Sequence, residues 1–383
     1  MPDLAYEAPS LLPEILINGR FLGQRVTGVQ RYARETLLCM DELLSRGEGD
    51  YARWTLLLPP GTAVPSLCRI ETEVVGRSSG HLWEQVDLPW RARKGLLVGF
   101  GLTGPITHRQ QIITIHDANV IRFPEAFSLP FRIWYRLLVP RLIARAPLTI
   151  AVSRFSAREA EQCYGASRHA LRIATEGWQH LERIEADDAI LDRHQLRGVP
   201  FAFAVGSLSA NKNFAVIARA LAILGPVAPR CVVAGDTKAT IFQRAGALPR
   251  SIHRVGYVSD AELKALYQNA TCFIFPSFYE GFGIPPLEAM ACGCAVIAST
   301  APALREVCAD AALYFDPRDP KELASKLYEV FASSELRTRM VTAGLERAGL
   351  YSWMENARLN LGYIHEHMKA THHSQLSGLS CHA

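Results

Sequence analysis

The feature that most constrains this chain is a repeated alternation of short apolar runs with longer amphipathic stretches. In the first half, apolar runs at 15–17, 54–58, 111–115 and 148–152 have the length and composition of buried strands. From Val29 onward, apolar residues recur at helical spacing between the first two of these runs. Strands that alternate with helices favour a parallel sheet, because parallel neighbours must be joined by a crossover. The pattern therefore predicts an α/β architecture.

A second series of the same kind follows a polar stretch over 182–198. Its predicted strands lie at 201–205, 231–234, 272–275, 295–298 and 312–315. Two series joined by a polar linker predict two Rossmann-like domains whose parallel sheets face a central cleft. We place an N-terminal domain at 1–185, a linker at 186–198, a C-terminal domain at 199–352, a terminal helix that crosses back at 353–370 and a polar tail at 371–383. Ligands of open α/β sheets bind outside the carboxyl ends of the strands, so chemistry is expected there.

Composition excludes several classes of protein. The residues are 49% hydrophobic and 20% charged, which is typical of a globular protein. At 383 residues, the chain is too long to form one ordinary hydrophobic core. A formal net charge of +4 is too small and too dispersed to indicate nucleic-acid binding. The sequence contains no run of about 18 apolar residues, so no transmembrane helix is predicted. Its acidic first residues do not resemble a signal peptide. Nine cysteines without a disulfide spacing favour reduced thiols in the cytoplasm.

Two short patterns look like cofactor or metal sites and are better explained otherwise. The run 99–104 matches G-x-G-x-x-G, but Pro105 follows where a helix should open, and no acidic residue lies on a strand about 20 positions further on. We therefore expect a glycine-rich turn there. The pair Cys292 and Cys294 lacks a second pair at zinc spacing, so we expect core packing and no metal.

The strongest motif is PSFYEGFGIPPLEAM, which spans 276–290. A predicted buried strand delivers the chain into a loop where glycines allow backbone amides to approach a ligand closely. Pro285 and Pro286 suit the first turn of a following helix. Glu280 lies in the loop and Glu288 inside the helix. Carboxylates facing a cleft can accept hydrogen bonds from a sugar diol, and a helix N-terminus suits a diphosphate.

This loop, with seven residues between its two glutamates, resembles that of family-4 glycosyltransferases, which are retaining enzymes of the GT-B fold. Further likenesses occur in the family's order between about residues 15 and 366. They are VTGVQ at a helix start (26–30), IHD at a strand end (115–117), AVSRFS (151–156), GSLSANKN after a strand (206–213) and YSW before the last helix (351–353). The resemblance is specific for the family and weakly informative about the sugar.

The resemblance implies a role for each matching residue. Glu288 should hold the nucleotide ribose, while Glu280 and the amides of the loop should hold the donor sugar and the phosphate edge. Lys212 should neutralise the departing diphosphate, and His116 should lie beside the anomeric carbon. We expect His116, Glu280 and Lys212 to be catalytic. The remaining donor-binding residues implied are Gly28, Gly206, Ser207, Asn211, Gly281, Phe282, Gly283 and Ile284. Arg20, Asp117 and Arg154 are expected on the acceptor side, and no metal or other cofactor is expected.

One position departs from the family pattern. Many members carry an arginine next to the glycine of the phosphate loop, where this chain has Ser207. Either another cation, such as Arg20 or Arg25, replaces that charge, or the catalyst is weaker. The resemblance also implies a front-face reaction in which the leaving phosphate helps to deprotonate the acceptor, with retention of configuration.

The resulting prediction is a retaining hexosyltransferase, with GDP-mannose the preferred donor, acting on a hydroxyl of a glycan or lipid-linked acceptor in bacterial surface polysaccharide synthesis. The alternatives are transfer from a UDP-sugar, a sugar-nucleotide epimerase and a catalytically silent regulatory homologue. No nucleic-acid partner is expected.

The basic and aromatic segment 131–145 leaves two interpretations open. It is either a helix that rests on an anionic membrane, or an ordinary domain helix with solvated arginines. The predicted location is the cytoplasm, at the inner face of the membrane if the first interpretation holds.

Overall fold

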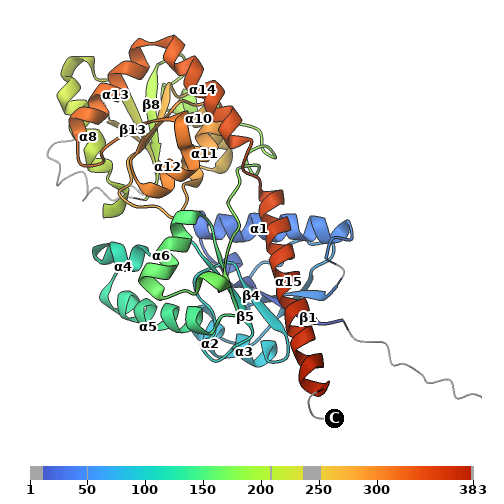
Figure 1. Cartoon of the computed structure of the whole chain (residues 1–383). Helices are drawn as coiled ribbons and strands as arrows, with labels where there is room; N and C mark the ends of the chain where they lie inside the picture. The colour runs from blue at the N-terminus through green and yellow to red at the C-terminus, as the bar shows by residue number, and fades with distance from the viewer. Residues whose placement is uncertain (1–11, 50, 208, 236–251, 381–383) are drawn as a thin grey trace, which may run out of the picture.

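The computed structural model describes residues 12–49, 51–207, 209–235 and 252–380. They form two α/β domains, one above the other in Figure 1. The first domain holds a seven-stranded sheet in the order β3-β2-β1-β4-β5-β6-β7, and the second a six-stranded sheet in the order β10-β9-β8-β11-β12-β13. All neighbouring strands are parallel. The prediction of two Rossmann-like domains with parallel sheets, the GT-B arrangement, is therefore confirmed.

The strands are three to six residues long. Those of the first sheet are β1 (Glu14–Asn18), β2 (Arg53–Leu58), β3 (Glu71–Val74), β4 (Leu96–Gly99), β5 (Gln111–Ile115), β6 (Leu148–Ala151) and β7 (Leu171–Ile173). Those of the second sheet are β8 (Phe201–Val205), β9 (Arg230–Ala234), β10 (Ile252–Gly256), β11 (Cys272–Phe275), β12 (Val296–Ser299) and β13 (Ala312–Phe315).

Helices cover both sheets. The first domain contains α1 (Gly28–Ser45), α2 (Gly80–Gln85), α3 (Asp87–Ala92), α4 (Asn119–Arg122), α5 (Leu129–Arg145) and α6 (Arg154–Tyr164). The connection to the second domain contains α7 (Ala189–Arg193). The second domain contains α8 (Phe214–Leu224), α10 (Asp260–Asn269), α11 (Ile284–Ala291), α12 (Pro302–Cys308), α13 (Pro320–Ala332) and α14 (Ser334–Ala348), and α15 (Trp353–Ser380) follows.

Three strands that the sequence pattern does not predict lie at sheet edges: β3, β7 and β10. Their polar composition reflects this position, since ETEV, LRI and IHRVG contain no continuous apolar run and none of their residues is buried. The fourth, β4, is a buried central strand whose apolar run LLVG was noted only as the lead-in to the glycine-rich turn. That turn is present, and no helix opens at its third glycine.

The last helix returns to the first domain and lies beside α1 (Figure 1). Tyr51 donates a hydrogen bond from its hydroxyl to the carbonyl of Leu361, and Tyr363 does the same to Ile173. The helix continues to Ser380. The terminal helix is therefore longer than the predicted 353–370, and it includes most of the predicted polar tail at 371–383; the last three residues lie outside the described part of the chain.

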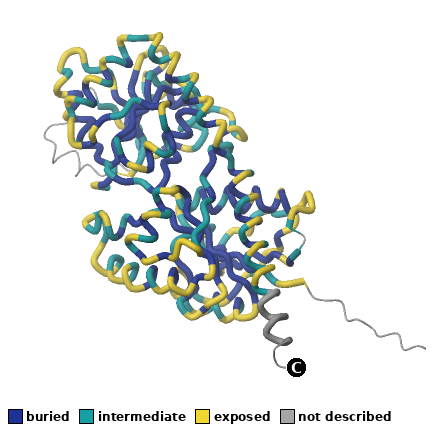
Figure 2. Tube along the Cα trace, in the orientation of Figure 1, coloured by how far each residue is buried: buried dark blue, intermediate teal, exposed yellow. Residues whose placement is uncertain are grey.

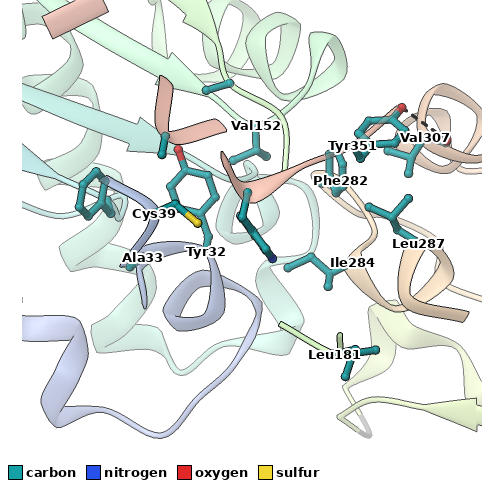
Figure 3. Packing of buried hydrophobic residues seen from close by; sticks show 14 of the residues in the cluster. Tyr32, Ala33, Cys39, Val152, Leu181, Phe282, Ile284, Leu287, Val307 and Tyr351 are labelled. Carbon is teal, nitrogen blue, oxygen red and sulfur yellow. Dashed lines mark hydrogen bonds between the residues drawn. The ribbon is translucent and has the colours of Figure 1, made fainter. Parts of the chain in front are cut away.

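Buried residues follow the two sheets, as Figure 2 shows by the dark trace at the centre of each domain. One apolar cluster continues from the first domain into the second. At the junction, Tyr32 and Val152 lie near Phe282, Ile284 and Tyr351 (Figure 3). The domains therefore share core contacts at the place where the carboxyl ends of their strands meet.

The strand orders fix where a ligand can bind. Order reverses between β1 and β4 in the first sheet and between β8 and β11 in the second. Open α/β sheets bind ligands in the crevice at such switch points. The segments after these strands, and after β5 beside β4, carry the residues that the sequence singles out.

Candidate active site

The second-domain part of the site is built from the loops after β8 and β11. Lys212 Nζ lies 2.6 Å from Glu280 Oε1, which joins the two loops by an ion pair. The amide of Phe278 donates to the carbonyl of Asn211 at 2.8 Å, and Asn213 Nδ2 donates to the carbonyl of Pro276 at 3.2 Å. The two loops therefore hold one cation and one carboxylate side by side at the switch point.

The glycine loop after β11 is pressed against the first domain. A Cβ atom built on Gly281 would lie 1.7 Å from the carbonyl oxygen of His116, so only glycine fits there. Ser153 and Ser156 donate from their hydroxyls to the carbonyl of Gly281 at 2.6 and 2.8 Å. Ser156 also donates to the carbonyl of His116 at 2.5 Å. The two serines of the AVSRFS segment thus bind the donor-side loop to the loop that carries His116.

A second set of contacts fixes the same junction. Tyr279 accepts a hydrogen bond from the amide of Ala118 at 2.9 Å and donates one to Glu159 at 2.9 Å. The carboxylate of Glu306, on α12, accepts from the amides of Arg154 and Phe155 at the start of α6. A carboxylate at a helix N-terminus is favourable because it meets unpaired amides and the positive end of the helix dipole. Each domain therefore supplies groups that stabilise the other.

His116 lies directly after β5 and is buried. Its Nε2–H donates to the carbonyl of Phe100 at 3.0 Å, and its Nδ1 lies 3.5 Å from Glu176 Oε1. The ring of Tyr32 packs edge-on against the imidazole, with centroids 4.9 Å apart. Loss of water raises the pKa of the neighbouring Asp117, and the charge of Glu280 adds to the increase. Raised carboxyl pKa values are a common property of functional sites.

Glu288 is buried on α11, and both of its oxygens have partners. His180 Nε2 lies 2.8 Å from Oε1, and the hydroxyl of Tyr267 donates to Oε2 at 3.0 Å. The indole N–H of Trp353 donates to His180 Nδ1 at 3.1 Å. Because Nδ1 accepts that bond, it is Nε2 that carries the proton and donates to Glu288. A ribose that binds Glu288 would use the remaining lone pairs of the carboxylate.

The first-domain part of the site is a pocket of about 320 Å³. It extends from His116 and Asp117 to the segments after β1 and β4 and to the start of α5. Three aromatic side chains on one wall stack in sequence: Phe127 on Phe131 with centroids 5.3 Å apart, and Phe131 on Tyr135 at 4.1 Å. Such a wall offers flat apolar faces beside polar groups, as small-molecule sites commonly do.

An ion-pair network also lines this pocket, on the side of Tyr135. Glu84 is almost fully buried and accepts hydrogen bonds from Arg20 Nε at 3.1 Å, Asn18 Nδ2 at 2.9 Å and the Thr103 hydroxyl at 2.9 Å. Burial alone would raise the pKa of Glu84, but these bonds, the contact with His81 and the charge of Arg20 outweigh it and lower that pKa. Arg20 also donates to Thr103 at 2.7 Å. The charge of Arg20 is therefore balanced within the first domain.

The other predicted site residues are placed as follows. Gly28 is the first residue of α1, and a Cβ there would meet no atom within 4 Å. Gly206 and Ser207 follow β8, and the Ser207 hydroxyl lies 3.0 Å from that of Ser209. Gly283 has a φ of +120° and precedes α11, which begins at Ile284. The side chain of Phe282 packs on Tyr351.

Among the described residues of the phosphate loop, none pairs with either arginine suggested as a substitute at Ser207. Arg20 is committed to Glu84, and Arg25 lies over the ring of Tyr257, 4.8 Å from its centroid. Arg154, predicted on the acceptor side, is exposed and does not line the pocket. The residues that sequence reasoning missed are Glu84, Glu176, His180 and Tyr267. A search for carboxylates directly after strands would have found Glu176 only if β7 had been recognised.

Comparisons with known proteins agree with this architecture. Residues 188–347 match the family Glycosyl transferases group 1. The chain is 29% identical to O-antigen chain mannosyltransferase B of Escherichia coli over 65% of this chain and 68% of that protein. It is 26% identical to O-antigen chain mannosyltransferase RfbU of Salmonella typhimurium over 82% of this chain and 90% of that protein.

Among solved structures, sucrose-phosphate synthase from Thermosynechococcus elongatus superposes with a TM-score of 0.72 at 18% identity, covering 94% of this chain and all of the other. This similarity concerns the fold. Together with the match of residues 188–347 to the group 1 glycosyl transferases and the similarity to the two mannosyltransferases, it shows a glycosyltransferase with the two-domain GT-B fold.

Proposed function

We propose that this protein transfers a mannosyl residue from GDP-mannose to a hydroxyl of a glycan acceptor during synthesis of a bacterial surface polysaccharide. The mannosyl and polysaccharide assignments are supported by the two O-antigen mannosyltransferases that the chain resembles. The observation that carries the proposal is the Lys212–Glu280 pair, which lies on loops that reach the first domain beside His116.

The donor site that we propose lies in the second domain. Lys212 would exchange its contact with Glu280 for the diphosphate, and the freed carboxylate would accept hydrogen bonds from the sugar hydroxyls. The amides before α11 and the positive end of that helix would add stabilisation of the phosphate charge. Because these groups supply positive charge at the leaving group, we propose that the reaction needs no metal. Gly28, with open space above it, would leave room for the phosphates.

The acceptor site that we propose is the first-domain pocket. Its Arg20–Glu84 pair balances its own charge, so it is better suited to an uncharged sugar than to a sugar phosphate. The stack of Phe127, Phe131 and Tyr135 offers apolar faces to a pyranose ring, while the remaining N–H groups of Arg20 can donate to its hydroxyls.

We propose that the configuration of the transferred sugar is retained. Among the described carboxylates near the junction, Glu280 would bind the sugar hydroxyls in the donor complex, and Glu288 pairs with His180 and Tyr267. Glu176 faces His116, and Asp117 accepts a hydrogen bond from the amide of Asn119. With each of these engaged, a front-face route in which the leaving phosphate takes the acceptor proton is favoured over attack by an enzymatic nucleophile. An α-linked product from GDP-α-mannose supports this route, and a β-linked product contradicts it.

We also propose that the first domain contacts an anionic membrane. Within the residues that the structure describes, no helix has the length and the apolar character that crossing a bilayer requires. However, α2, α3 and α5 lie along the edge of the first domain remote from the second (Figure 1). Their exposed apolar side chains are Leu82, Val86, Trp90, Leu129, Ile133 and Leu137.

The charge of this region fits such a contact. Between residues 76 and 147 the chain has ten Arg and Lys residues against four Asp and Glu, although its whole formal charge is only +4. Two of the four acids, Glu84 and Asp117, face the pocket. Exposed apolar side chains with a basic surround are the properties that bind a protein to an anionic interface.

Vesicle binding tests the membrane contact. Sedimentation with phosphatidylglycerol–phosphatidylcholine vesicles should recover the wild type, whereas phosphatidylcholine alone should not. Replacing Arg136, Arg141 and Arg145 by Ser should weaken binding by about 1 kcal/mol for each charge. A matched triple change at the exposed second-domain residues Arg219, Arg318 and Arg339 should have little effect. Equal losses in the two variants would contradict the proposed surface.

A donor and acceptor panel tests the reaction itself. GDP-mannose and the corresponding UDP-, ADP- and dTDP-sugars are incubated with the protein in EDTA, with and without mannose-containing oligosaccharides. We expect GDP release that depends on the acceptor and a product heavier by one hexose. Release without an acceptor, or an epimerised donor, would favour the epimerase alternative. Activity with only a UDP-sugar would show that GDP-mannose is not the donor, while the assignment as a glycosyltransferase would stand.

A further inference from the structure

A buried carboxylate behind His116 has no part in the donor or acceptor contacts described above. Glu176 follows β7, is 4% exposed and faces His116 Nδ1, with 3.5 Å between that nitrogen and Oε1. His116 is the one partner that the structure shows for this carboxyl group within the described residues. A buried carboxylate is costly unless it is paired, so its position requires an explanation.

The segment that carries Glu176 is held rigidly. Asn356, on α15, donates from Nδ2 to the carbonyls of Ala174 at 3.2 Å and Thr175 at 2.7 Å. A Cβ on Gly177 would lie 2.3 Å from the amide nitrogen of Trp353, so the chain passes directly against the start of α15. Glu176 is therefore fixed by the terminal helix that crosses between the domains.

The other ring nitrogen of His116 determines what Nδ1 can do. The carbonyl of Phe100 can only accept a hydrogen bond, so Nε2 carries a proton. Nδ1 is then the nitrogen that gains or loses a proton, and it is the one that faces Glu176.

The surroundings oppose a lone negative charge on Glu176. Glu280 and Glu288 are close enough to raise its pKa, in addition to the larger effect of burial, and His116 acts in the opposite direction. Lys212 is paired with Glu280, and His180 with Glu288. The remaining titratable groups around the pair are Asp117 and the hydroxyl of Tyr32, whose pKa is itself raised by burial.

We infer that Glu176 is a positioning residue that shares one proton with Nδ1 of His116 and thereby sets the orientation and protonation of that ring. In both arrangements of the proton, on nitrogen or on oxygen, the pair is uncharged. Loss of the proton leaves one negative charge beside the reaction centre. The role in turnover rests on the function proposed above, while the shared proton does not.

The ring nitrogen signals of His116 test the shared proton without any substrate. In protein labelled with ¹⁵N-histidine, the His116 signals are assigned by their loss in His116→Asn. We expect Nε2 to carry its proton in the wild type, and Nδ1 to give a signal between those of a bare and a protonated ring nitrogen. In Glu176→Gln the carboxylate that shares the proton is gone, so the Nδ1 signal should move away from this intermediate position. The matched control is Glu182→Gln, the same chemical change at an exposed residue of the same connection, which should leave the Nδ1 signal unchanged.

Kinetics test the positioning role. In Glu176→Gln, kcat should fall about tenfold to a hundredfold while nucleotide affinity and melting temperature stay near those of the wild type. A merely structural role would instead lower the melting temperature and leave the Nδ1 signal in place. If Glu176→Gln does not fold, Glu176→Asp, which keeps the carboxyl group, should show a smaller displacement of the Nδ1 signal.

Two outcomes would overturn the inference. An unchanged Nδ1 signal in Glu176→Gln would show that no proton is shared, even if kcat falls. An unchanged kcat with a displaced Nδ1 signal would show that the pair does not serve turnover. A protein that transfers no sugar from any donor in the panel, but shows the displaced Nδ1 signal, would contradict the proposed function and leave the shared proton in place.

Discussion

The two halves of the site are built in different ways. The second-domain half presents an ion pair between Lys212 and Glu280, together with backbone amides before α11, all within two loops. The first-domain half presents a pocket assembled from the ends of β1, β4 and β5 with α2 and α5, and its ion pair is buried and satisfied. If the second-domain half binds a diphosphate, as we propose, short loops suffice because charge and backbone amides provide recognition. A glycan, which we propose for the first-domain half, requires a shaped pocket.

The positive charges of the two halves, Lys212 and Arg20, also differ in how firmly they are held by their partners. Lys212 is available to exchange its partner, because a ligand phosphate can replace one carboxylate. Arg20 is held by Glu84 and Thr103, so it acts as a fixed donor. The absence of an arginine at position 207 is therefore not offset by Arg20, and Lys212 is the main cation that we expect on the diphosphate.

The largest effect is expected from a substitution in the second-domain half of the site. Lys212→Ala should lower kcat about 10²- to 10³-fold, because removing one preorganised group from the leaving-group site costs that much. Lys326→Ala is the matched control, since Lys326 also pairs with a glutamate, Glu329, at 3.1 Å in the same domain. Steady-state kinetics with saturating donor measure both. Similar losses in the two variants would show that the Lys212–Glu280 pair has no special role.

A pair of glycine substitutions tests how the halves are joined. Gly281→Ala places a Cβ atom against the carbonyl of His116 and should destabilise the protein by about 1–3 kcal/mol. Gly28→Ala meets no neighbouring atom within 4 Å, so its stability should stay within about 0.5 kcal/mol of the wild type, while donor affinity falls. Chemical denaturation and nucleotide titration distinguish them. Equal stability of the two variants would mean that the junction can relax.

The first-domain half is tested by Arg20→Lys. Lysine keeps the charge but not the planar arrangement of donors that contacts Glu84 and Thr103, so the acceptor KM should rise about tenfold. Donor KM should not change, because Arg20 contacts first-domain residues. An increase in donor KM with no change for the acceptor would reverse the assignment of the two halves.

The smallest expected effect concerns the raised pKa of Asp117. A carboxyl whose pKa is higher in the folded than in the unfolded state makes stability fall as pH rises through those values. Asp117→Asn should therefore raise the melting temperature slightly near pH 7 and not at acid pH, where both states are protonated. Its amide oxygen can still accept the bond from the backbone of Asn119, which Asp117 accepts at 2.8 Å. A lower melting temperature at pH 7 would contradict the pKa direction.

The second-domain half of the site could be predicted from the sequence better than the first-domain half. The central strands β8 and β11 are continuous apolar runs, and their loops carry a dense motif, so Lys212, Glu280 and Glu288 could be named in advance. The edge strands β3, β7 and β10 contain charged residues, because one side of each faces no neighbouring strand, and they were missed. Missing β7 also hid Glu176.

The acceptor pocket could not be assembled from the sequence for a different reason. Glu84 lies on a six-residue helix, Thr103 follows β4 and Arg20 follows β1, so no spacing relates them. Their contact depends on the three-dimensional order of the strands. The same holds for His180, which reaches Glu288 over a separation of 108 residues.

We propose that the nucleotide binds to the second-domain half of the site and that the first-domain ion pair serves the acceptor. Thermal melting of the wild type, Lys212→Ala and Arg20→Lys with GDP in EDTA tests this directly, because GDP at a hundredfold excess over Kd should stabilise by about 2.7 kcal/mol. We predict the same increase in melting temperature upon GDP addition for the wild type and Arg20→Lys, and a much smaller one for Lys212→Ala. Loss of the shift in Arg20→Lys, with the shift kept in Lys212→Ala, would contradict the account.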